Sequence, residues 1–467
     1  MKQLRYLMFF VASLALSVAF YSCDDDCDCE NSAAPIIHRV FLQDVNSSVP
    51  DREVDFARLG QVIRIEGENL LGLTKVFFNE YSSYFNPVFI TNTSMIVQIS
   101  RDVPIIPNGG EIRLVKGGQS SEPFPFEIRS AAPSITKISH TLPLPGEWIT
   151  VYGSGLSEVS KVVFPGGIVE TTEIIQGINE KGEPDGKSFK VKVPNGISEN
   201  GGSIFIECSN GGAYSPAYFG CKNCVVLDFD GRGVHGFWGS GGMINDEDIL
   251  SAPLGQGNVS QGNYCPMLPS RLIPISAGTP RATEVWTSGN EIWSELFVES
   301  GLIAGNAPVA EVAVQFDIYV PADWSGTGML GINLTNSWSA GEQWTGQCYN
   351  YIPWLNGATK VPFNTKPDKD TPASWVTVTV PLSEFYFVAR DLTTFATFND
   401  VIAEREKASY KNFGLMFHNN DFTLKNITGK ESDEATVFES ASTSVGIYVD
   451  NLRIVSLATP KYSDFPE

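Results

Sequence analysis

Histidine is scarce in this chain of 467 residues, and its histidines stand far apart in the sequence. None has the His-Glu-x-x-His spacing through which one helix face holds zinc. A lone histidine is more often a structural side chain than a catalytic or metal-binding one. The sequence therefore predicts no cofactor held by histidine. The four histidines are His38, His140, His235 and His418.

Positive charge is also in short supply. The chain has 32 Lys and Arg against 53 Asp and Glu, which gives a formal net charge of −21. Nucleic acids and anionic membranes attract basic proteins, so neither is the expected main partner. The charge permits a neutral ligand and does not identify one.

Long apolar runs are missing after the N-terminus, so no transmembrane helix is expected. Residues 1–22 read as a signal peptide, with a positive start at Lys2 and Arg5 and a short apolar run to Phe20. A small residue, Ser22, precedes Cys23 at the cleavage site, which is typical of bacterial lipoproteins. We therefore predict that Cys23 is lipidated and that lipid alone anchors the chain.

The residues after Cys23 suggest where that anchor lies. Three aspartates, Asp24 to Asp26, open a predicted acidic tether over residues 23–33. Acidic residues at this place resemble the surface-export signal of glycan-scavenging gram-negative bacteria. The resemblance implies an outer-membrane lipoprotein that faces outward; the alternative is a merely solvated linker.

Seven cysteines remain after Cys23, and an odd number cannot all pair within one chain. The pair Cys221 and Cys224 has Cys-x-x-Cys spacing, but no second such pair and no βαβ pattern accompanies it. We expect a disulfide, with Cys208 as a candidate partner, because exported proteins favour disulfides over zinc or redox sites.

The remaining composition favours β-structure. Glycine and proline are frequent, at 43 and 28 residues, and long helical patterns are few. A chain of this length holds two to four domains, each with its own core. A turn-rich all-β protein is therefore expected.

A unit that occurs twice fills the first half of the chain. Gly60, Gly67, Leu70 and Lys75 recur at one common offset as Gly146, Gly153, Leu156 and Lys161. Alternating apolar residues between the glycines indicate half-buried strands, and each copy has the size of an immunoglobulin-like sandwich. We place the two domains at residues 34–130 and 131–220. Their pattern resembles IPT/TIG domains, which implies spacer domains in a surface protein.

The C-terminal domain, residues 221–467, reads as a larger sandwich. Alternating or buried strands are expected at 225–231, ending at an acidic turn, and at 312–320, 375–380, 413–417 and 445–455, and one short helix at Asn399 to Ser409. Many strands joined by glycine-rich loops favour a jelly roll. Asp228, Asp230 and Asp450 are candidates for a structural Ca²⁺, or for strand caps and a pair with Arg453.

Tryptophan is concentrated within this domain, because six of the nine fall between residues 285 and 354. If Gly289-Asn290 is a two-residue hairpin loop, Trp286 and Trp293 lie opposite each other on one face. Rings in polar loops are poorly placed for a core and well placed to stack on sugar rings, while polar side chains bond the hydroxyls. The predicted glycan-binding residues are Trp286, Trp293, Trp338, Trp344, Tyr351, Trp354, Glu291, Asn336 and Gln343.

The order of the parts gives a second resemblance. The first strand ends in Asp-Phe-Asp-Gly at residues 228–231 and the last contains Tyr-Val-Asp-Asn-Leu-Arg-Ile at 448–454, as in carbohydrate-binding jelly rolls. Lipoprotein signal, tether, repeats and aromatic-rich domain together resemble surface glycan-binding protein B of polysaccharide-utilisation loci. The resemblance implies a non-catalytic protein that binds xyloglucan or related β-glucans. A glycan importer and a surface hydrolase are its implied partners.

Two other functions are compatible with the sequence. A glycoside hydrolase with an all-β domain needs two carboxylates that flank the scissile bond. Acidic residues do stand near the tryptophans, but we recognise no hydrolase signature around them. An adhesin for a host protein explains the repeats but not the tryptophan density. The candidate carboxylates are Glu284, Glu291, Glu295, Asp323 and Glu342.

Overall fold

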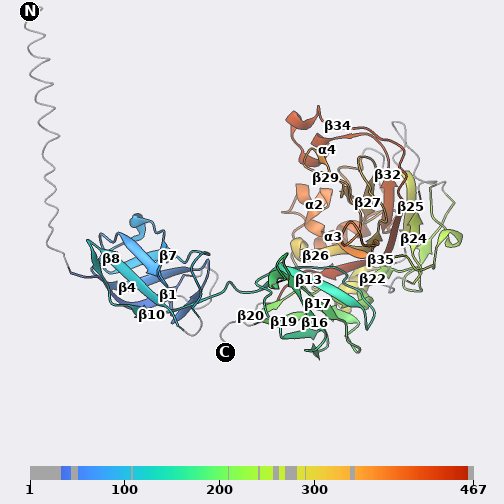
Figure 1. Cartoon of the computed structure of the whole chain (residues 1–467). Coiled ribbons are helices and arrows are strands. Elements are labelled where there is room, and N and C mark those ends of the chain that lie inside the picture. Colours follow the sequence, from blue (N-terminus) through green and yellow to red (C-terminus); the bar gives the residue numbers. More distant parts are fainter. Residues whose placement is uncertain are drawn as a thin grey trace, which may run out of the picture. The chain divides into compact units, whose positions relative to one another are not determined.

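The computed structural model describes residues 33–43, 51–106, 109–182, 184–208, 210–239, 242–255, 262–268, 281–289, 291–336 and 342–460. The chain forms two compact units, one up to Ala131 and one from Ala132 onward (Figure 1). The predicted signal peptide, the lipidation site Cys23 and the acidic tether up to residue 32 lie outside the described residues. Within the part that is described, no helix is long and apolar enough to cross a membrane.

The first unit is a sandwich of two antiparallel sheets. One has the order β2-β1-β4-β7 and the other β10-β8-β5-β6, with β9 on β8, while β11 and β3 form a parallel pair. Its strands are β1 (Ile36–Leu42), β2 (Arg52–Glu53), β3 (Phe56–Arg58), β4 (Val62–Glu68), β5 (Lys75–Phe78), β6 (Tyr81–Ser83), β7 (Ser94–Gln98), β8 (Glu111–Lys116), β9 (Gln119–Ser120), β10 (Phe124–Pro125) and β11 (Glu127–Arg129), with a 3-10 turn η1 (Pro87–Phe89).

The second repeat is the same kind of sandwich. Its sheets run β12-β13-β17-β16 and β15-β14-β19-β20, and β18 pairs with β21. Its strands are β12 (Ser134–Ile138), β13 (Trp148–Ser154), β14 (Lys161–Phe164), β15 (Ile168–Glu170), β16 (Ile174–Ile178), β17 (Pro184–Lys192), β18 (Asn200–Gly202), β19 (Phe205–Cys208), β20 (Gly211–Tyr214) and β21 (Phe219–Cys221), followed by η2 (Lys222–Cys224).

A close backbone approach explains why one glycine recurs in both copies. The first strand of each copy has a bulge, after Ile37 in β1 and after Ile135 in β12. At the bulge a carbonyl oxygen reaches the facing glycine, where a Cβ would collide with it: Gly67 faces Ile36 O and Gly153 faces Ser134 O. Only glycine fits such a position, so the repeated glycines report a shared bulge.

The C-terminal domain is a third, larger sandwich with two five-stranded sheets. One has the order β22-β35-β26-β31 with β24 also on β35, and the other β23-β25-β32-β27-β28. Its strands are β22 (Val225–Leu227), β23 (His235–Gly236), β24 (Cys265–Met267), β25 (Arg281–Thr287), β26 (Val312–Tyr319), β27 (Met329–Asn333), β28 (Cys348–Tyr351), β29 (Leu355–Asn356), β30 (Thr359–Lys360), β31 (Val376–Pro381), β32 (Gly414–His418), β33 (Phe422–Thr423), β34 (Val437–Phe438) and β35 (Ile447–Ser456).

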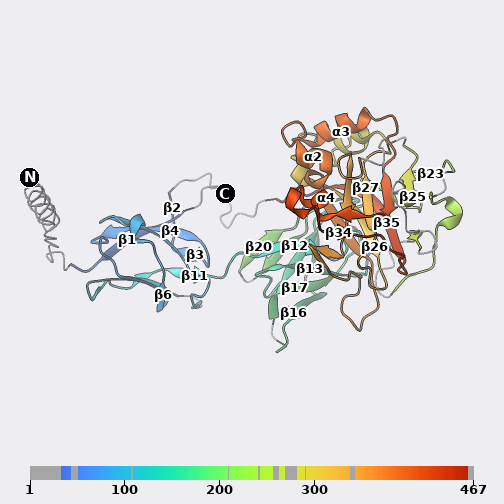
Figure 2. The same ribbon diagram turned by 90° about the horizontal axis from the view of Figure 1, so that it is seen from above.

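Short helical segments surround this sandwich. Figures 1 and 2 show α2, α3 and α4 on the side opposite β25. The segments are η3 (Asp246–Asp248), the π-helix η4 (Ser294–Glu299), η5 (Val309–Glu311), η7 (Leu382–Glu384), α2 (Tyr386–Arg390), α3 (Phe398–Glu406), α4 (Leu424–Thr428) and η8 (Glu431–Asp433). The predicted all-β class, the predicted strands and the helix near residue 399 are confirmed.

The second repeat packs against the C-terminal sandwich through a buried polar cluster, which explains why both belong to one unit. Thr141 from the second repeat accepts a bond from Arg453 Nη2 (2.9 Å) and donates to Gln315 Oε1 (3.0 Å). Arg453 also forms an ion pair with Asp317 at 2.9 Å, with both side chains buried. Gln315 and Asp317 alternate along β26 with core residues such as Phe316, so this cluster lies on the side of the sheet away from the core.

His140 lies beside this cluster and is fully buried, with its Nδ1 3.7 Å from Asp317 Oδ1. Burial lowers the pKa of His140, against the opposing charge of Asp317. Burial alone would raise the pKa of Asp317, but the charges of Arg453 and His140 hold it below its usual range. The histidine is therefore neutral in the folded protein near pH 7.

We predict that acidification destabilises the second unit through His140. When folding lowers the pKa of a histidine, the free energy of unfolding is highest above the pKa of the unfolded state, about 6.5. It decreases as the pH falls from there toward the pKa of the folded state. Chemical denaturation at pH 7.5 and pH 5.5 should show a loss on the order of 1 kcal/mol. Buried Asp450 has a raised pKa, so its protonation at low pH stabilises the folded state and offsets part of the loss. The control is therefore His140→Asn, whose free energy of unfolding should change less between the two pH values. Equal pH slopes for both proteins would contradict the assignment.

The disulfide differs from the predicted one. Cys221 pairs with Cys224, and the predicted partner Cys208 is a buried free thiol. The turn η2 brings the ends of the Cys-x-x-Cys segment together, and Cys208 lies in the same core cluster as both of these cysteines without bonding to either. The prediction of a disulfide at this segment is confirmed, and the pairing to Cys208 is wrong.

The three candidate calcium ligands have other partners in the structure. Asp228 accepts bonds from the backbone of Asp230 and Arg232, and Asp230 accepts from Asn263 N, so both shape turns. Asp450 is buried, and burial raises its pKa well above the usual range. In the described part of the chain no group of three or more His, Cys, Asp or Glu could hold an ion. Arg453 pairs with Asp317 rather than with Asp450.

Candidate functional site

The sheet β23-β25-β32-β27-β28 has one face in the core and one face turned away from it, which we call the outer face. Val285 and Leu415 belong to the core, and their neighbours in the strands point the other way. The strand register sets these outward residues in two rows across the sheet. The first row is Gly236, Trp286, Gly414, Asn333 and Cys348, and the second is Glu284, Met416, Gly331 and Asn350.

Glycines on the outer face allow rings to lie directly on the backbone. At Gly414 a Cβ would lie 2.7 Å from the Trp286 ring, and at Gly331 it would meet the ring of His418. At Gly236 a Cβ would lie 3.0 Å from the ring of Trp238. Each glycine thus leaves space for a ring next to the backbone. The residues of both rows are buried, and Met243 packs against Trp286 and Met416.

Polar groups converge over Gly331. The Asn350 side chain donates through Nδ2 to Gln343 O (2.9 Å), and its Oδ1 points over Gly331, as does His418 Nε2. Asn350 is only 4% exposed, and its Oδ1 has no hydrogen-bond partner among the residues that the structure describes. A buried acceptor without a partner is costly, so this position suits a hydroxyl donor from a ligand.

One ring of the outer face is open to solvent. Trp238 is 48% exposed and follows the edge strand β23, with its ring over Gly236. Gly236 pairs directly with Trp286, so the exposed indole lies next to the buried one on the same face. Phe237 beside it is also exposed. This edge of the face therefore offers a flat apolar ring that borders buried polar groups.

The predicted hairpin between Trp286 and Trp293 is wrong. Trp286 belongs to β25, which pairs with β23 and β32, while Trp293 precedes the π-helix η4. Trp286 lies on the outer face but is fully buried, and its Nε1 donates to Glu284 Oε2 (2.9 Å). It forms the floor of the face rather than an exposed platform.

Two further predicted platform rings are core residues, so their prediction is wrong. Trp293 is buried between Phe297 and Phe413, with the Arg405 guanidinium 4.3 Å from its ring centre. Trp354 is buried, and its Nε1 donates to Gly328 O (2.7 Å). Both rings complete the core between the sheets, where no surface ligand reaches them.

Glu291 is also placed differently from the prediction. Its carboxylate lies 3.6 Å from Arg405 Nη2, and its side chain is 10% exposed. Arg405 is itself buried, and burial lowers its pKa against the charges of Glu291 and Glu406. Glu291 therefore serves as the counter-ion of a buried arginine, a structural role.

The remaining predicted residues stay predictions. Trp344 is half-buried and packs against Tyr386 and Phe422, next to Gln343. Gln343 is buried and donates to Asn420 Oδ1 (3.2 Å). Tyr351 and Asn336 are half-buried: the Tyr351 ring meets Phe316 and Phe363 edge-on, and Asn336 N donates to Tyr410 O. Trp338 lies outside the described residues.

The carboxylates considered for hydrolysis have separate environments. Glu284 lies on the outer face and accepts the Trp286 bond, whereas Glu291 pairs with Arg405. Asp323 accepts a bond from Asn364, and Glu342 is exposed. The thiol of Cys348 is buried, which raises its pKa to about 12 and keeps it protonated. Among these described residues, only Glu284 contributes a carboxylate to the two rows of the outer face.

Comparison with known proteins places the chain in a family. The model of the surface glycan-binding protein B xyloglucan-binding domain matches residues 219–456, the whole C-terminal sandwich. An IPT/TIG domain-containing protein of Bacteroides ovatus is 22% identical, over 97% of this chain and 99% of the relative. The chain therefore belongs to the surface glycan-binding protein B family.

One solved structure shows the same fold with a TM-score above 0.5. The crystal structure of the surface glycan-binding protein PbSGBP-B from Prevotella bryantii is 17% identical with a TM-score of 0.55, over 91% of this chain and all of that one. An SGBP-B from a complex xyloglucan utilization locus of Bacteroides uniformis has the same identity and coverage and a TM-score of 0.42. The first likeness supports the three-sandwich fold.

The sequence reasoning missed Trp238, Asn350 and His418. Trp238 stands in a Gly/Ser-rich segment, so the same loop rule that selected Trp344 would have selected it outside residues 285–354. Asn350 and His418 carry no local signal. They meet only because β28 and β32 both flank β27.

Proposed function

We propose that this protein is a non-catalytic cell-surface lipoprotein that binds a polysaccharide, with β-glucan or xyloglucan favoured, on the outer face of its C-terminal sandwich. The observations that carry the proposal lie on one sheet face: the exposed Trp238 ring at its β23 edge and, at the opposite β28 edge, Asn350 Oδ1, a buried acceptor with no hydrogen-bond partner among the described residues. A pyranose offers C–H groups to an indole and hydroxyls to such acceptors. The family's xyloglucan-binding domain covers this same sandwich, which supports the choice of glycan.

The affinity expected from such a face is modest. One aromatic stack contributes about 1 kcal/mol beyond area burial, and ordering a flexible sugar chain offsets part of the gain. Weak and reversible binding suits a protein that holds glycan near a surface hydrolase and then releases it to an outer-membrane importer. We propose lipidation at Cys23 as the anchor, and the repeats as the support that holds the third sandwich.

Opposite sides of the C-terminal sandwich have different roles in this proposal. The sheet with β26 and β35 carries the second repeat through Thr141 and Arg453. The outer face belongs to the other sheet, so the repeat does not compete with a ligand for it. A polysaccharide can therefore contact the exposed Trp238 edge of this face while the domain stays fixed to its support.

A panel of polysaccharides tests the function. In affinity gel electrophoresis, xyloglucan or mixed-linkage β-glucan should retard the mature protein, whereas unrelated fungal and host polysaccharides should not. Release of reducing sugar during long incubation would instead support the hydrolase alternative, with Glu284 as its first candidate. Absence of retardation by every polysaccharide would overturn the proposal and favour the adhesin.

We further predict that Asn350→Ala lowers affinity for the retained glycan about fivefold. The change removes one buried hydrogen-bonding group, a loss on the order of 1 kcal/mol. Isothermal titration calorimetry measures it, with Asn356→Ala as the matched control because Asn356 is exposed in the short strand β29. Equal affinities for the two variants would place the hydroxyl contacts elsewhere.

A further inference from the structure

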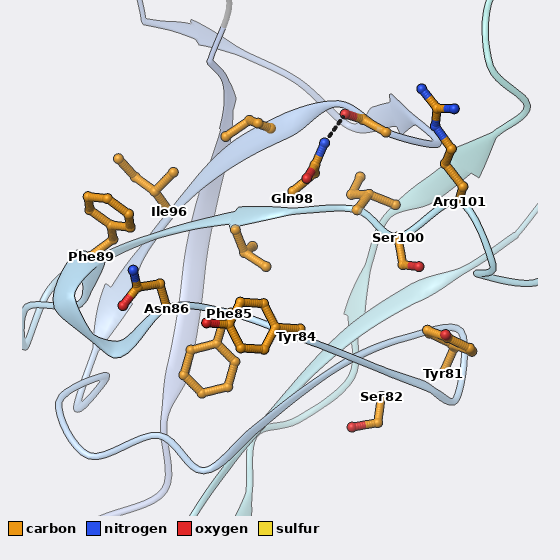
Figure 3. A pocket seen from close by; sticks show the side chains of 14 residues that line it. Tyr81, Ser82, Tyr84, Phe85, Asn86, Phe89, Ile96, Gln98, Ser100 and Arg101 are labelled. Carbon is orange, nitrogen blue, oxygen red and sulfur yellow. Dashed lines mark hydrogen bonds between the residues drawn. The ribbon is translucent and has the colours of Figure 1, made fainter.

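The first repeat contains a groove of 660 Å³ between the edges of its two sheets. Strand β7 ends one sheet and strand β6 ends the other, so the groove lies along the open side of the sandwich. The turn η1 and the segment after β6 line it with aromatic side chains (Figure 3). This groove belongs to the first unit, far along the chain from the outer face.

Two of the four rings, Tyr84 and Phe89, contribute little to the core. Tyr84 is 84% exposed and Phe89 is 55% exposed, while Tyr81 and Phe85 are half-buried against the core of the sandwich. Figure 3 shows Tyr84 and Phe85 between Phe89 on one side and Tyr81 on the other. Exposed apolar rings that lie in a row mark an interaction site, because they favour contact with a ligand over contact with water.

The polar side chains that line the groove are neutral or positive, and one carboxylate borders it: Asp102 accepts from the hydroxyls of Tyr81 and Ser100, both at 3.4 Å. Gln98 holds its place by donating from Nε2 to Gly60 O (2.9 Å), and Arg101 stands near the same end of the groove. None of the described residues that line the groove is a carboxylate, although the chain has 53 Asp and Glu. Rings bordered by amide, hydroxyl and guanidinium groups are the chemistry that recognises a neutral sugar chain.

The second repeat supplies an internal comparison. Val76 faces Ser83 in the first copy, and the corresponding Val162 faces Glu170 in the second. The residues that follow are Tyr84-Phe85 in the first copy and Thr171-Thr172 in the second. The shared sandwich therefore does not require these rings, and the first copy alone has them.

We propose that this groove is a second, weaker glycan site that takes a neutral pyranose segment of the polysaccharide bound by the C-terminal domain. This inference rests on the proposed function. Two sites on one chain raise the effective concentration of a long polymer at each site, whereas a short oligosaccharide gains nothing from linkage. The first repeat would then take part in capture rather than serve only as a spacer.

The test uses the full mature chain and xyloglucan, or whichever polysaccharide of the panel the protein retains. The double variant Tyr84→Ala/Phe89→Ala should bind the long polysaccharide about three- to tenfold more weakly, as expected when linkage between two sites is lost. Calorimetry with a short oligosaccharide of the same glycan should show two sites per chain in the unchanged protein and one in the variant. Tyr152→Ala, an exposed tyrosine of the second repeat, is the matched control.

The outcomes separate the two proposals. Residual binding by Trp238→Ala that disappears when Tyr84→Ala/Phe89→Ala is added supports the groove. If the groove variant keeps the affinity and stoichiometry of the unchanged protein while Trp238→Ala loses binding, the inference is overturned and the proposed function stands. An extended peptide paired to the β7 edge would then be the better candidate ligand. Absence of glycan binding by the unchanged chain overturns both.

Discussion

Replacing Trp238 by alanine is expected to weaken polysaccharide binding by about tenfold or more, a loss of about 1.4 kcal/mol, without a change in thermal stability. The ring is 48% exposed, so the unliganded fold depends little on it. Its neighbours on the outer face are a buried indole and buried polar groups, so a stacked sugar would lose its main apolar contact. Affinity gel electrophoresis and calorimetry measure the loss.

Trp148→Ala is the matched control for this experiment. Trp148 is 38% exposed but begins strand β13 of the second repeat, so its removal should leave affinity unchanged. A conservative Trp238→Phe should recover part of the affinity, because a smaller ring still stacks. Full affinity in Trp238→Ala would show that the outer face is not the site, and Trp344 with Tyr386 would become the next candidate.

Replacing Arg453 by alanine is expected to lower the free energy of unfolding of the second unit by about 3–5 kcal/mol. The change leaves Asp317 buried without its cation and removes bonds to Gln315, Thr141 and Asn451. Because Thr141 belongs to the second repeat, the loss should loosen that repeat from the sandwich. Denaturant unfolding gives the energy, and limited proteolysis between the two domains reports the loosening.

Two further variants make this prediction specific. Lys161→Ala breaks a surface pair with Glu207, whose side chains are 40% and 50% exposed, and should cost less than about 1 kcal/mol. Arg453→Met/Asp317→Leu removes both buried charges and should recover much of the loss, since an apolar pair tolerates burial. A loss in Arg453→Ala no larger than in Lys161→Ala would mean that the cluster contributes little.

Some of the site could not be predicted because it is assembled by strand pairing between distant segments. The Trp286 ring lies next to Gly414, and Asn350 and His418 both approach Gly331, in a sheet whose strand order does not follow the chain. The sequence around Trp286 and Trp293 allows a hairpin, and nothing local opposes it. Strand β25 pairs with β32 instead of forming this hairpin, because that pairing places Val285 beside Leu415 in a continuous core.

Residue chemistry and periodicity by themselves determined the class of this protein. Alternation with period two predicts strands such as β26 and β31. In the structure β26 is buried on both faces, because the second repeat covers the face that carries Gln315 and Asp317. The glycines repeated at one offset indicated two copies of one domain, and the structure then showed the shared bulge that requires Gly67 and Gly153. These constraints are local in the sequence, and they were enough to predict three β-sandwich domains and their order along the chain.

Only the tertiary structure decided which rings are available. The N–H of an indole in a polar segment can donate to water at the surface or to a buried acceptor in the core. The local sequence around the tryptophan does not distinguish these two environments. Trp354 is buried in the core and donates its Nε1 hydrogen to Gly328 O, whereas Trp238 is exposed at the surface. Exposure depends on what packs over a ring from elsewhere in the chain, and that is a property of the assembled sheets.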